Sequence, residues 1–134
     1  DYQMYRMGDT IGRVMAIDVA NKKVAWQSAS PLPLFSGMLV TKGGLLFTGD
    51  QRGRFLALDK KSGKELWSFQ TGSGIVGQPV TWEMDGEQYV SIVLGWGGAV
   101  PLWGGEVAKT VANLNQGGMV WTFKLPKQLA SKSK

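Results

Sequence analysis

The segment from Gly95 to Gly105 carries the residue types best suited to binding a small molecule. It reads Gly-Trp-Gly-Gly-Ala-Val-Pro-Leu-Trp-Gly-Gly, so that glycines flank Trp96 on both sides and follow Trp103. Glycine lets a backbone approach a ligand closely, and an indole ring offers a flat face beside it. The segment therefore predicts a planar cofactor resting near Trp96, with backbone N–H groups of residues 97–99 meeting its oxygens. The alternative is a wide loop that covers one end of the fold.

Outside that segment the chemistry available to the chain is narrow. Its 134 residues include neither cysteine nor histidine. Thiolate and imidazole metal sites, a Ser-His-Asp triad and a Cys-His pair are therefore excluded within it. Carboxylates, hydroxyls, amides and the backbone remain.

Two carboxylates and two indoles occur at matching places in an internal repeat. Residues 8–26 recur 41 residues later, and eight of the nineteen positions are identical. Asp18 and Asp59 each end an apolar run, where an aspartate can accept hydrogen bonds from the N–H groups of a turn. Trp26 and Trp67 follow in the next run, and each is predicted to wedge between neighbouring sheets. We interpret all four residues as structural.

The period of the repeat predicts the fold. A unit of about 40 residues made of short strands indicates a β-propeller, in which no four-stranded blade can bury its faces alone. A ring needs at least four blades, or roughly 160 residues at this period, so the 134 residues predict an incomplete ring. The short runs from which strands are expected are 3–7, 13–18, 23–27, 38–41, 43–49, 54–59, 64–69, 71–82, 88–94 and 118–124.

The composition fits an all-β protein with a buried core. Hydrophobic residues make up 43% of the chain, and its 19 glycines suit tight turns. Four of the fifteen cations behind the net charge of +5 lie in the last eleven residues, and no basic stripe with interleaved aromatic residues indicates nucleic-acid binding. An acidic protein is a better candidate than a nucleic acid for a partner of this positively charged chain. No run approaches the roughly 18 apolar residues of a membrane span, so no transmembrane segment is predicted.

Several linked motifs resemble those of one enzyme family. The pattern Ala-x-Asp-x-x-x-Gly-Lys-x-x-Trp at 57–67 resembles the tryptophan-docking motif of quinoprotein alcohol dehydrogenases, and 16–26 is a weaker version. Residues 45–50, 63–82 and 85–90 look like the last blades of these enzymes. The segment 95–105 is closer to the ethanol-oxidising branch than to the methanol dehydrogenase large subunit. The resemblance covers nearly all of 1–127, and 128–134 is predicted to be a flexible basic tail.

The resemblance implies an eight-bladed propeller in the periplasm that holds pyrroloquinoline quinone (PQQ) and a Ca²⁺ or lanthanide ion on its axis. A primary alcohol would give a hydride to the quinone and become an aldehyde, an aspartate would take the hydroxyl proton, and electrons would pass to a cytochrome c. This chain would be the carboxy-terminal segment, inactive without the preceding blades. In the family, the catalytic aspartate and the metal ligands precede the region represented here. The resemblance thus implies no catalytic residue and no metal ligand in this chain.

The same resemblance supplies the candidate cofactor contacts. A Gly-Trp pair that meets the quinone through its backbone in the methanol branch falls on Gly98 and Ala99, so a backbone contact is kept and an indole is lost. Trp96 and Trp103 are expected in the wall of the substrate cavity, with Trp96 also beside the cofactor. Phe35 replaces a tryptophan of the family, which keeps an aromatic face but removes an N–H donor.

Two other classes of protein stay open on the sequence alone. A non-enzymatic propeller scaffold with similar repeats would need the docking tryptophans, but it gives no reason for the segment 95–105. A half-ring that self-associates would also satisfy the repeat.

Overall fold

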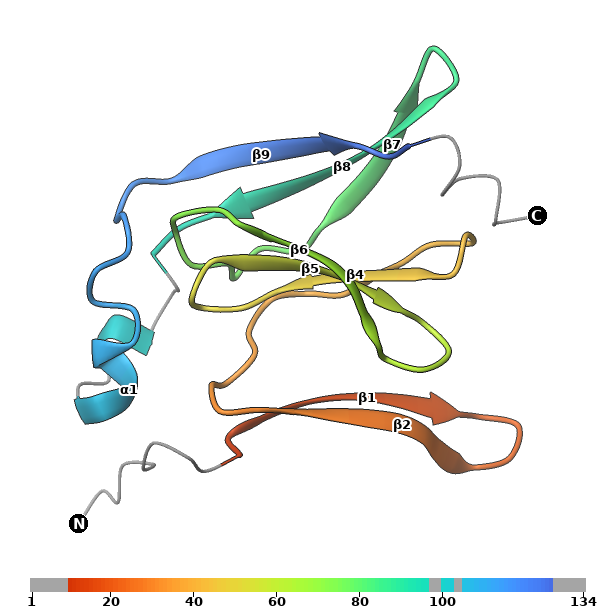
Figure 1. The fold of residues 1–134 in the computed structure, drawn as a ribbon, viewed down its shortest axis with the longest axis horizontal. Helices are drawn as coiled ribbons and strands as arrows, with labels where there is room; N and C mark the ends of the chain where they lie inside the picture. Colours follow the sequence, from red (N-terminus) through yellow and green to blue (C-terminus); the bar gives the residue numbers. More distant parts are fainter. Residues whose placement is uncertain (1–9, 97–99, 103–104, 127–134) are drawn as a thin grey trace.

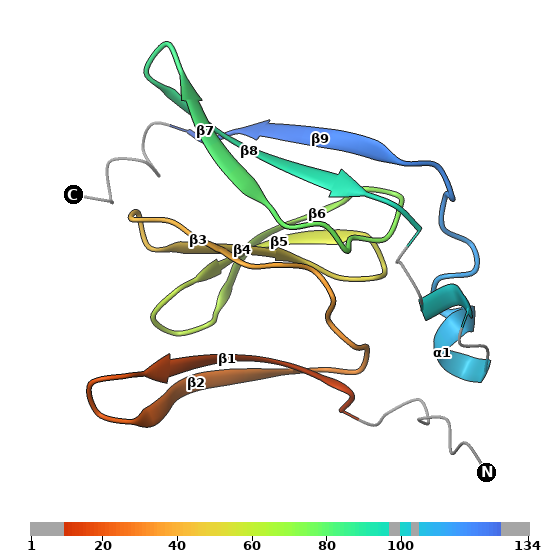
Figure 2. The same cartoon turned by 180° about the vertical axis from the view of Figure 1, so that it is seen from behind.

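The computed structural model describes residues 10–96, 100–102 and 105–126. Within these residues the strands form three antiparallel sheets that lie one beside the next in chain order, as Figure 1 and the reverse view in Figure 2 show. The predicted run at 3–7 and the predicted tail at 128–134 lie outside the described residues. No helix in the described part is long and apolar enough to cross a membrane.

The first sheet is a hairpin of β1 (Gly12–Asp18) and β2 (Lys23–Ser30). Its turn is held by Asp18, whose carboxylate accepts hydrogen bonds from the backbone N–H of Asn21 at 3.0 Å and from the Asn21 side-chain amide at 2.7 Å. These hydrogen bonds lower the pKa of Asp18, because they favour the charged form. The aspartate therefore fixes the turn from which β2 starts.

The second sheet contains four strands in the order β3 (Leu39–Val40), β4 (Leu45–Gly49), β5 (Arg54–Asp59) and β6 (Glu65–Gln70). Its β5–β6 hairpin repeats the β1–β2 hairpin. In both, the pairing register shifts directly before the last apolar residue of the first strand. Asp59 accepts hydrogen bonds from the hydroxyl and the backbone N–H of Ser62, each at 2.8 Å, which lowers its pKa. Gly63 completes the turn at a φ of 71°, a conformation that glycine tolerates best.

The third sheet has the order β7 (Val80–Met84), β8 (Glu87–Leu94) and β9 (Met119–Lys124). Asp85 and Gly86 join β7 to β8 with φ values of 54° and 70°, the positive angles of a type I′ hairpin turn. Between β8 and β9 lie a 3₁₀ turn, Val100–Leu102, and a short helix, α1 (Gly105–Lys109). The strands expected from the sequence leave a gap between residues 94 and 118, and no helix was predicted in it.

The main apolar core lies between the second and third sheets. Eight buried residues from both sheets and the loop before β7 form it, with Phe55 fully buried. The Phe55 ring lies 5.8 Å from that of Phe47 and 5.5 Å from that of Phe123 on β9, measured between centroids. Val111, after α1, packs with Leu32 in a smaller cluster. The expected all-β architecture is thus confirmed, with one short helix added.

The two repeated tryptophans meet different surfaces. The indole N–H of Trp26 donates to the backbone carbonyl of Lys60, in the β5–β6 turn of the next sheet, at 2.9 Å. Its ring covers Gly63 so closely that a Cβ there would lie 2.5 Å from the indole Cε3. Trp67 packs edge-on against Phe123 of the third sheet at 5.3 Å and is 40% exposed. Each indole therefore links its own sheet to the next, but only Trp26 is seated on a turn.

Candidate functional site

The loops around Trp96 are tied together at one end of the sheets. Where β8 ends, the N–H of Gly95 donates to the carbonyl of Gly74 at 2.9 Å, and Ile75 forms a bridge with Leu94. The N–H of Ile75 in turn donates to the carbonyl of Asp50 at 3.0 Å. The start of the Gly-rich segment is therefore anchored to the loop before β7 and, through it, to the turn after β4.

Trp96 is held in an unusual backbone conformation. Its φ of 42° lies in the left-handed region, where a bulky side chain costs about 1–3 kcal/mol unless its surroundings compensate. Its indole Nε1 is buried and has no hydrogen-bond partner among the described residues. A buried N–H without an acceptor is unfavourable by about 1–3 kcal/mol, so this donor marks a place where an external acceptor atom fits.

Phe35 belongs to the Pro-rich crossing between β2 and β3 and is 45% exposed. The next residue, Ser36, anchors the crossing. Its hydroxyl donates to the carbonyl of Gly77 at 3.0 Å and accepts a hydrogen bond from the N–H of Gly49 at 3.1 Å. The crossing is thus joined to the same loop system that holds Trp96.

The other predicted contacts are not placed. Gly98, Ala99 and Trp103 lie outside the described residues. Their assignment to the cofactor and to the cavity wall therefore stays a prediction.

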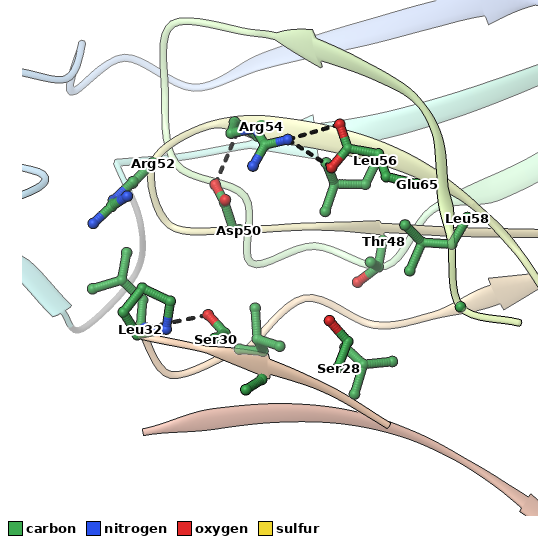
Figure 3. Close-up of a pocket in the computed structure, with 15 residues that line it drawn as sticks. Ser28, Ser30, Leu32, Thr48, Asp50, Arg52, Arg54, Leu56, Leu58 and Glu65 are labelled. Atoms are coloured by element: carbon green, nitrogen blue, oxygen red, sulfur yellow. Dashed lines mark hydrogen bonds and ion pairs between the residues drawn. The ribbon is translucent and has the colours of Figure 1, made fainter. Parts of the chain in front are cut away.

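A hollow of about 290 Å³ between the first and second sheets is a different kind of site (Figure 3). Its charged side chains are already engaged. Arg54 donates to both carboxylate oxygens of Glu65 at 2.8 and 2.9 Å, and the Asp50 carboxylate accepts the backbone N–H of Arg54 at 3.0 Å. Arg52 lies close enough to interact electrostatically with Asp50. The hollow flanks a two-stranded sheet, and we assign it to sheet packing.

Burial raises the pKa of Asp50, since the hollow offers its carboxylate less water than an exposed site would. The next residue is Gln51, which is fully buried; within the described part of the chain, neither polar atom of its side-chain amide has a hydrogen-bond partner. Sequence reasoning missed Gln51, because a glutamine between an aspartate and an arginine has the appearance of an exposed turn residue. It also missed Ser73, which lies in a run that resembles an ordinary turn.

Among the described residues, no three acidic side chains gather as they would around a metal ion. The chemistry that the described site offers is therefore recognition. It provides a buried N–H donor at Trp96 and an aromatic face at Phe35, both on anchored loops.

Comparison with known proteins defines the family. The family model of the glucose/ethanol/alcohol dehydrogenase β-propeller domain, labelled PQQ, matches residues 9–90. The chain belongs to this family of quinoprotein dehydrogenase propellers. The recognised motifs and the expected incomplete propeller are thereby confirmed.

Individual relatives agree with the family assignment. Quinoprotein alcohol dehydrogenase PedH of Pseudomonas putida is 62% identical over 121 residues, which cover 90% of this chain and 20% of PedH. Quinoprotein ethanol dehydrogenase of Pseudomonas aeruginosa is 55% identical over 118 residues, covering 88% of this chain and 19% of that enzyme. The chain thus spans about a fifth of the length of these curated relatives.

Solved structures show the same fold. A europium-containing methanol dehydrogenase superposes with a TM-score of 0.74 at 34% identity, covering 88% of this chain and 24% of that structure. Quinohemoprotein alcohol dehydrogenase of Comamonas testosteroni superposes with a TM-score of 0.71 at 35% identity, covering 84% of this chain and 16% of that structure.

Proposed function

We propose that this chain is the carboxy-terminal share of a periplasmic quinoprotein dehydrogenase that oxidises primary alcohols to aldehydes and passes electrons to a cytochrome c. The family match and the names of the relatives support an alcohol dehydrogenase that uses PQQ. A butanol dehydrogenase of Thauera butanivorans, 47% identical over 87 residues, is named for cytochrome c, which supports the acceptor. Because the chain spans a fifth of its relatives, the activity belongs to the complete protein.

The buried, unpartnered indole N–H of Trp96 is the observation that carries the proposal. PQQ supplies an oxidising quinone that accepts the hydride from the alcohol. Its carbonyl and carboxylate oxygens are acceptors, which is the chemistry that an orphaned donor needs. In this proposal Trp96 would donate to the cofactor and, with Trp103, would wall the substrate cavity. The backbones of Gly98 and Ala99 would supply the remaining contacts.

Phe35 has a more limited role in this proposal. It presents an aromatic face from the anchored crossing but has no N–H to donate. The Ca²⁺ or lanthanide ion would be bound mainly by residues outside this chain. One structural neighbour is named for its europium, which supports a lanthanide as one of the metals the family accepts.

The scaffold alternative explains less of the structure. A scaffold needs Trp26 on the next sheet and has that contact. It gives no reason for an indole N–H to be buried without an acceptor at Trp96. The family assignment also favours the enzyme.

Exchange of Trp96 for phenylalanine in the complete protein tests the proposal. Trp96→Phe keeps the ring and removes the donor, so we expect PQQ to bind about 5–10-fold more weakly, equivalent to one hydrogen bond. Trp82→Phe is the matched control, because the Trp82 indole donates to the Ser91 hydroxyl at 2.9 Å on the β7–β8 hairpin. Unchanged PQQ affinity and turnover in Trp96→Phe would contradict the role assigned to Trp96, whereas a wild-type protein that neither binds PQQ nor oxidises alcohols would favour the scaffold.

The isolated chain gives a second test. We expect it neither to bind PQQ tightly in the presence of Ca²⁺ nor to oxidise alcohols with a dye as acceptor. Tight binding by these 134 residues alone would show that the site is not shared with the other blades.

A further inference from the structure

One buried hydroxyl joins three loops beside the proposed cofactor site. Ser73 is fully buried in the loop between β6 and β7. Its hydroxyl donates to the backbone carbonyl of Asn115, in the loop after α1, at 2.6 Å. The same oxygen accepts a hydrogen bond from the backbone N–H of Trp96 at 2.9 Å. The hydroxyl thus donates one hydrogen bond and accepts another at the same time, and its two partners lie on segments far from it in the sequence.

The contact to Trp96 falls where the sheet stops supporting the backbone. Strand β8 ends at Leu94, and the N–H of Gly95 is bonded to the carbonyl of Gly74. At the next residue the chain turns into the left-handed region, with a φ of 42° that a tryptophan adopts only when its surroundings impose it. Ser73 provides the hydrogen-bond partner that the sheet no longer offers the backbone N–H there.

We infer that Ser73 is a positioning residue of the cofactor site. By holding the backbone of Trp96, it fixes where the indole N–H points and keeps that donor buried and free for an external acceptor. It acts through Trp96 and does not touch the cofactor itself. The inference rests on the proposed function for the identity of the acceptor.

The same loop contains a matched comparison. Thr71 is also buried, and its hydroxyl contacts the carbonyls of Gly53 at 2.8 Å and Ser73 at 2.9 Å. These contacts fasten the loop to the β4–β5 turn without any bond to Trp96. Loss of either hydroxyl therefore weakens the loop, but only loss of the Ser73 hydroxyl releases Trp96.

The test compares Ser73→Ala with Thr71→Ala in the complete protein. We expect both variants to lower the melting temperature of the cofactor-free protein by similar amounts. Only Ser73→Ala is expected to weaken PQQ binding, by about 5–10-fold when titrated in excess Ca²⁺, while Thr71→Ala stays within about two-fold of wild type. Equal losses of affinity in the two variants, or no loss in Ser73→Ala, would overturn the inference.

A double-mutant cycle shows whether Ser73 acts through Trp96. In a Trp96→Phe background the indole N–H is gone, so Ser73→Ala should weaken PQQ binding by less than about two-fold further. Fully additive losses would mean that Ser73 acts by another route. If Ser73→Ala does not fold, Ser73→Cys keeps a weak donor and acceptor at similar size, and an intermediate loss of affinity is expected.

A spectroscopic readout separates this inference from the proposed function. The indole N–H resonance of Trp96 in the cofactor-free protein should shift in Ser73→Ala and stay in place in Thr71→Ala. Failure of the wild-type protein to bind PQQ would refute the proposed function, yet this resonance would still show whether Ser73 positions the indole. An unmoved resonance in Ser73→Ala would refute the positioning role alone.

Discussion

The two interfaces between neighbouring sheets solve the same problem in different ways. Between the first and second sheets, Trp26 is seated on the β5–β6 turn, and a hollow lined partly by charged groups remains beside it. Between the second and third sheets, Phe55 and its neighbours form a continuous apolar core, while Trp67 is left 40% exposed. Identical repeat residues thus receive different environments, because each tryptophan depends on the sheet that follows it.

The residues of the third sheet explain why Trp67 is not seated in the same way. The N–H of Leu125 bonds the carbonyl of Gln88 at 2.8 Å, just as the N–H of Lys60 bonds that of Gly44 at 2.9 Å. The second and third sheets therefore have the same backbone hydrogen-bond pattern as far as Lys60 and Leu125. Lys124 then stands where Asp59 holds the turn, and Pro126 has no N–H to donate to such a carboxylate. An apolar groove of about 340 Å³ lies beside Trp67 instead.

The largest effect should come from the core of the second interface. Phe55→Ala in the complete protein is expected to cost about 3–5 kcal/mol, because it empties a fully buried ring site. Leu56→Ala, the adjacent residue that faces the hollow of the first interface, should cost less than about 2 kcal/mol. Urea unfolding measures both, and equal losses would mean that the two interfaces are packed alike.

The seat of Trp26 can be removed from the other side. Gly63→Ala combines strain at a φ of 71° with overlap of the Trp26 ring, so we expect a loss of about 3 kcal/mol. Gly86→Ala has nearly the same φ, 70°, with no atom of the described residues within 4 Å of the new methyl group, and should lose only about 1 kcal/mol. Thermal unfolding of the two variants gives the difference. Similar losses of stability in the two variants would show that the Trp26 ring moves aside at little cost.

The hydrogen bond of Trp26 sets it apart from Trp67. Trp26→Phe removes the donor to the carbonyl of Lys60 and should cost about 1 kcal/mol beyond the change in ring size. Trp67 makes no hydrogen bond through its indole within the described residues, so Trp67→Phe should cost less than about 0.5 kcal/mol beyond the change in ring size. Hydrogen exchange at the flanking strands would report both, and a larger loss at Trp67 would reverse the comparison.

The smallest effect concerns pH and the hollow. The pKa of Asp50 is raised above its usual 3.8 by burial, so its contribution to stability is complete below 3.8 and is lost as pH rises through the folded-state value. Asp59, in an exposed turn, has a lowered pKa and shows the opposite sign, losing its contribution as pH falls. Asp50→Asn should therefore reduce the extra free energy of unfolding that the protein has at acidic pH, and Asp59→Asn should not. Urea unfolding across the acidic range tests the two slopes.

The repeat made most of the fold predictable, whereas the site was only partly so. Eight shared residues, with Asp18 and Asp59 closing the turns, were enough to place both hairpins because turn chemistry is local. Helix α1 was missed, since a helix of five residues is too short to leave a periodic pattern in the sequence. The buried hydroxyl of Ser73 and the unpaired donor of Trp96 were out of reach, because both depend on contacts between segments distant in the sequence.

The close approach of Trp26 to Gly63 also matters for protein engineering. The repeat suggests units that could be exchanged between related enzymes, cut wherever the sequence pattern restarts. Yet the space that the Trp26 indole of one unit occupies exists because the next unit has a glycine, Gly63, at that place. A chimera that brings in a bulkier residue at 63 would damage the unit before the cut as well as its own. Exchange boundaries should therefore keep each tryptophan together with the turn that receives it.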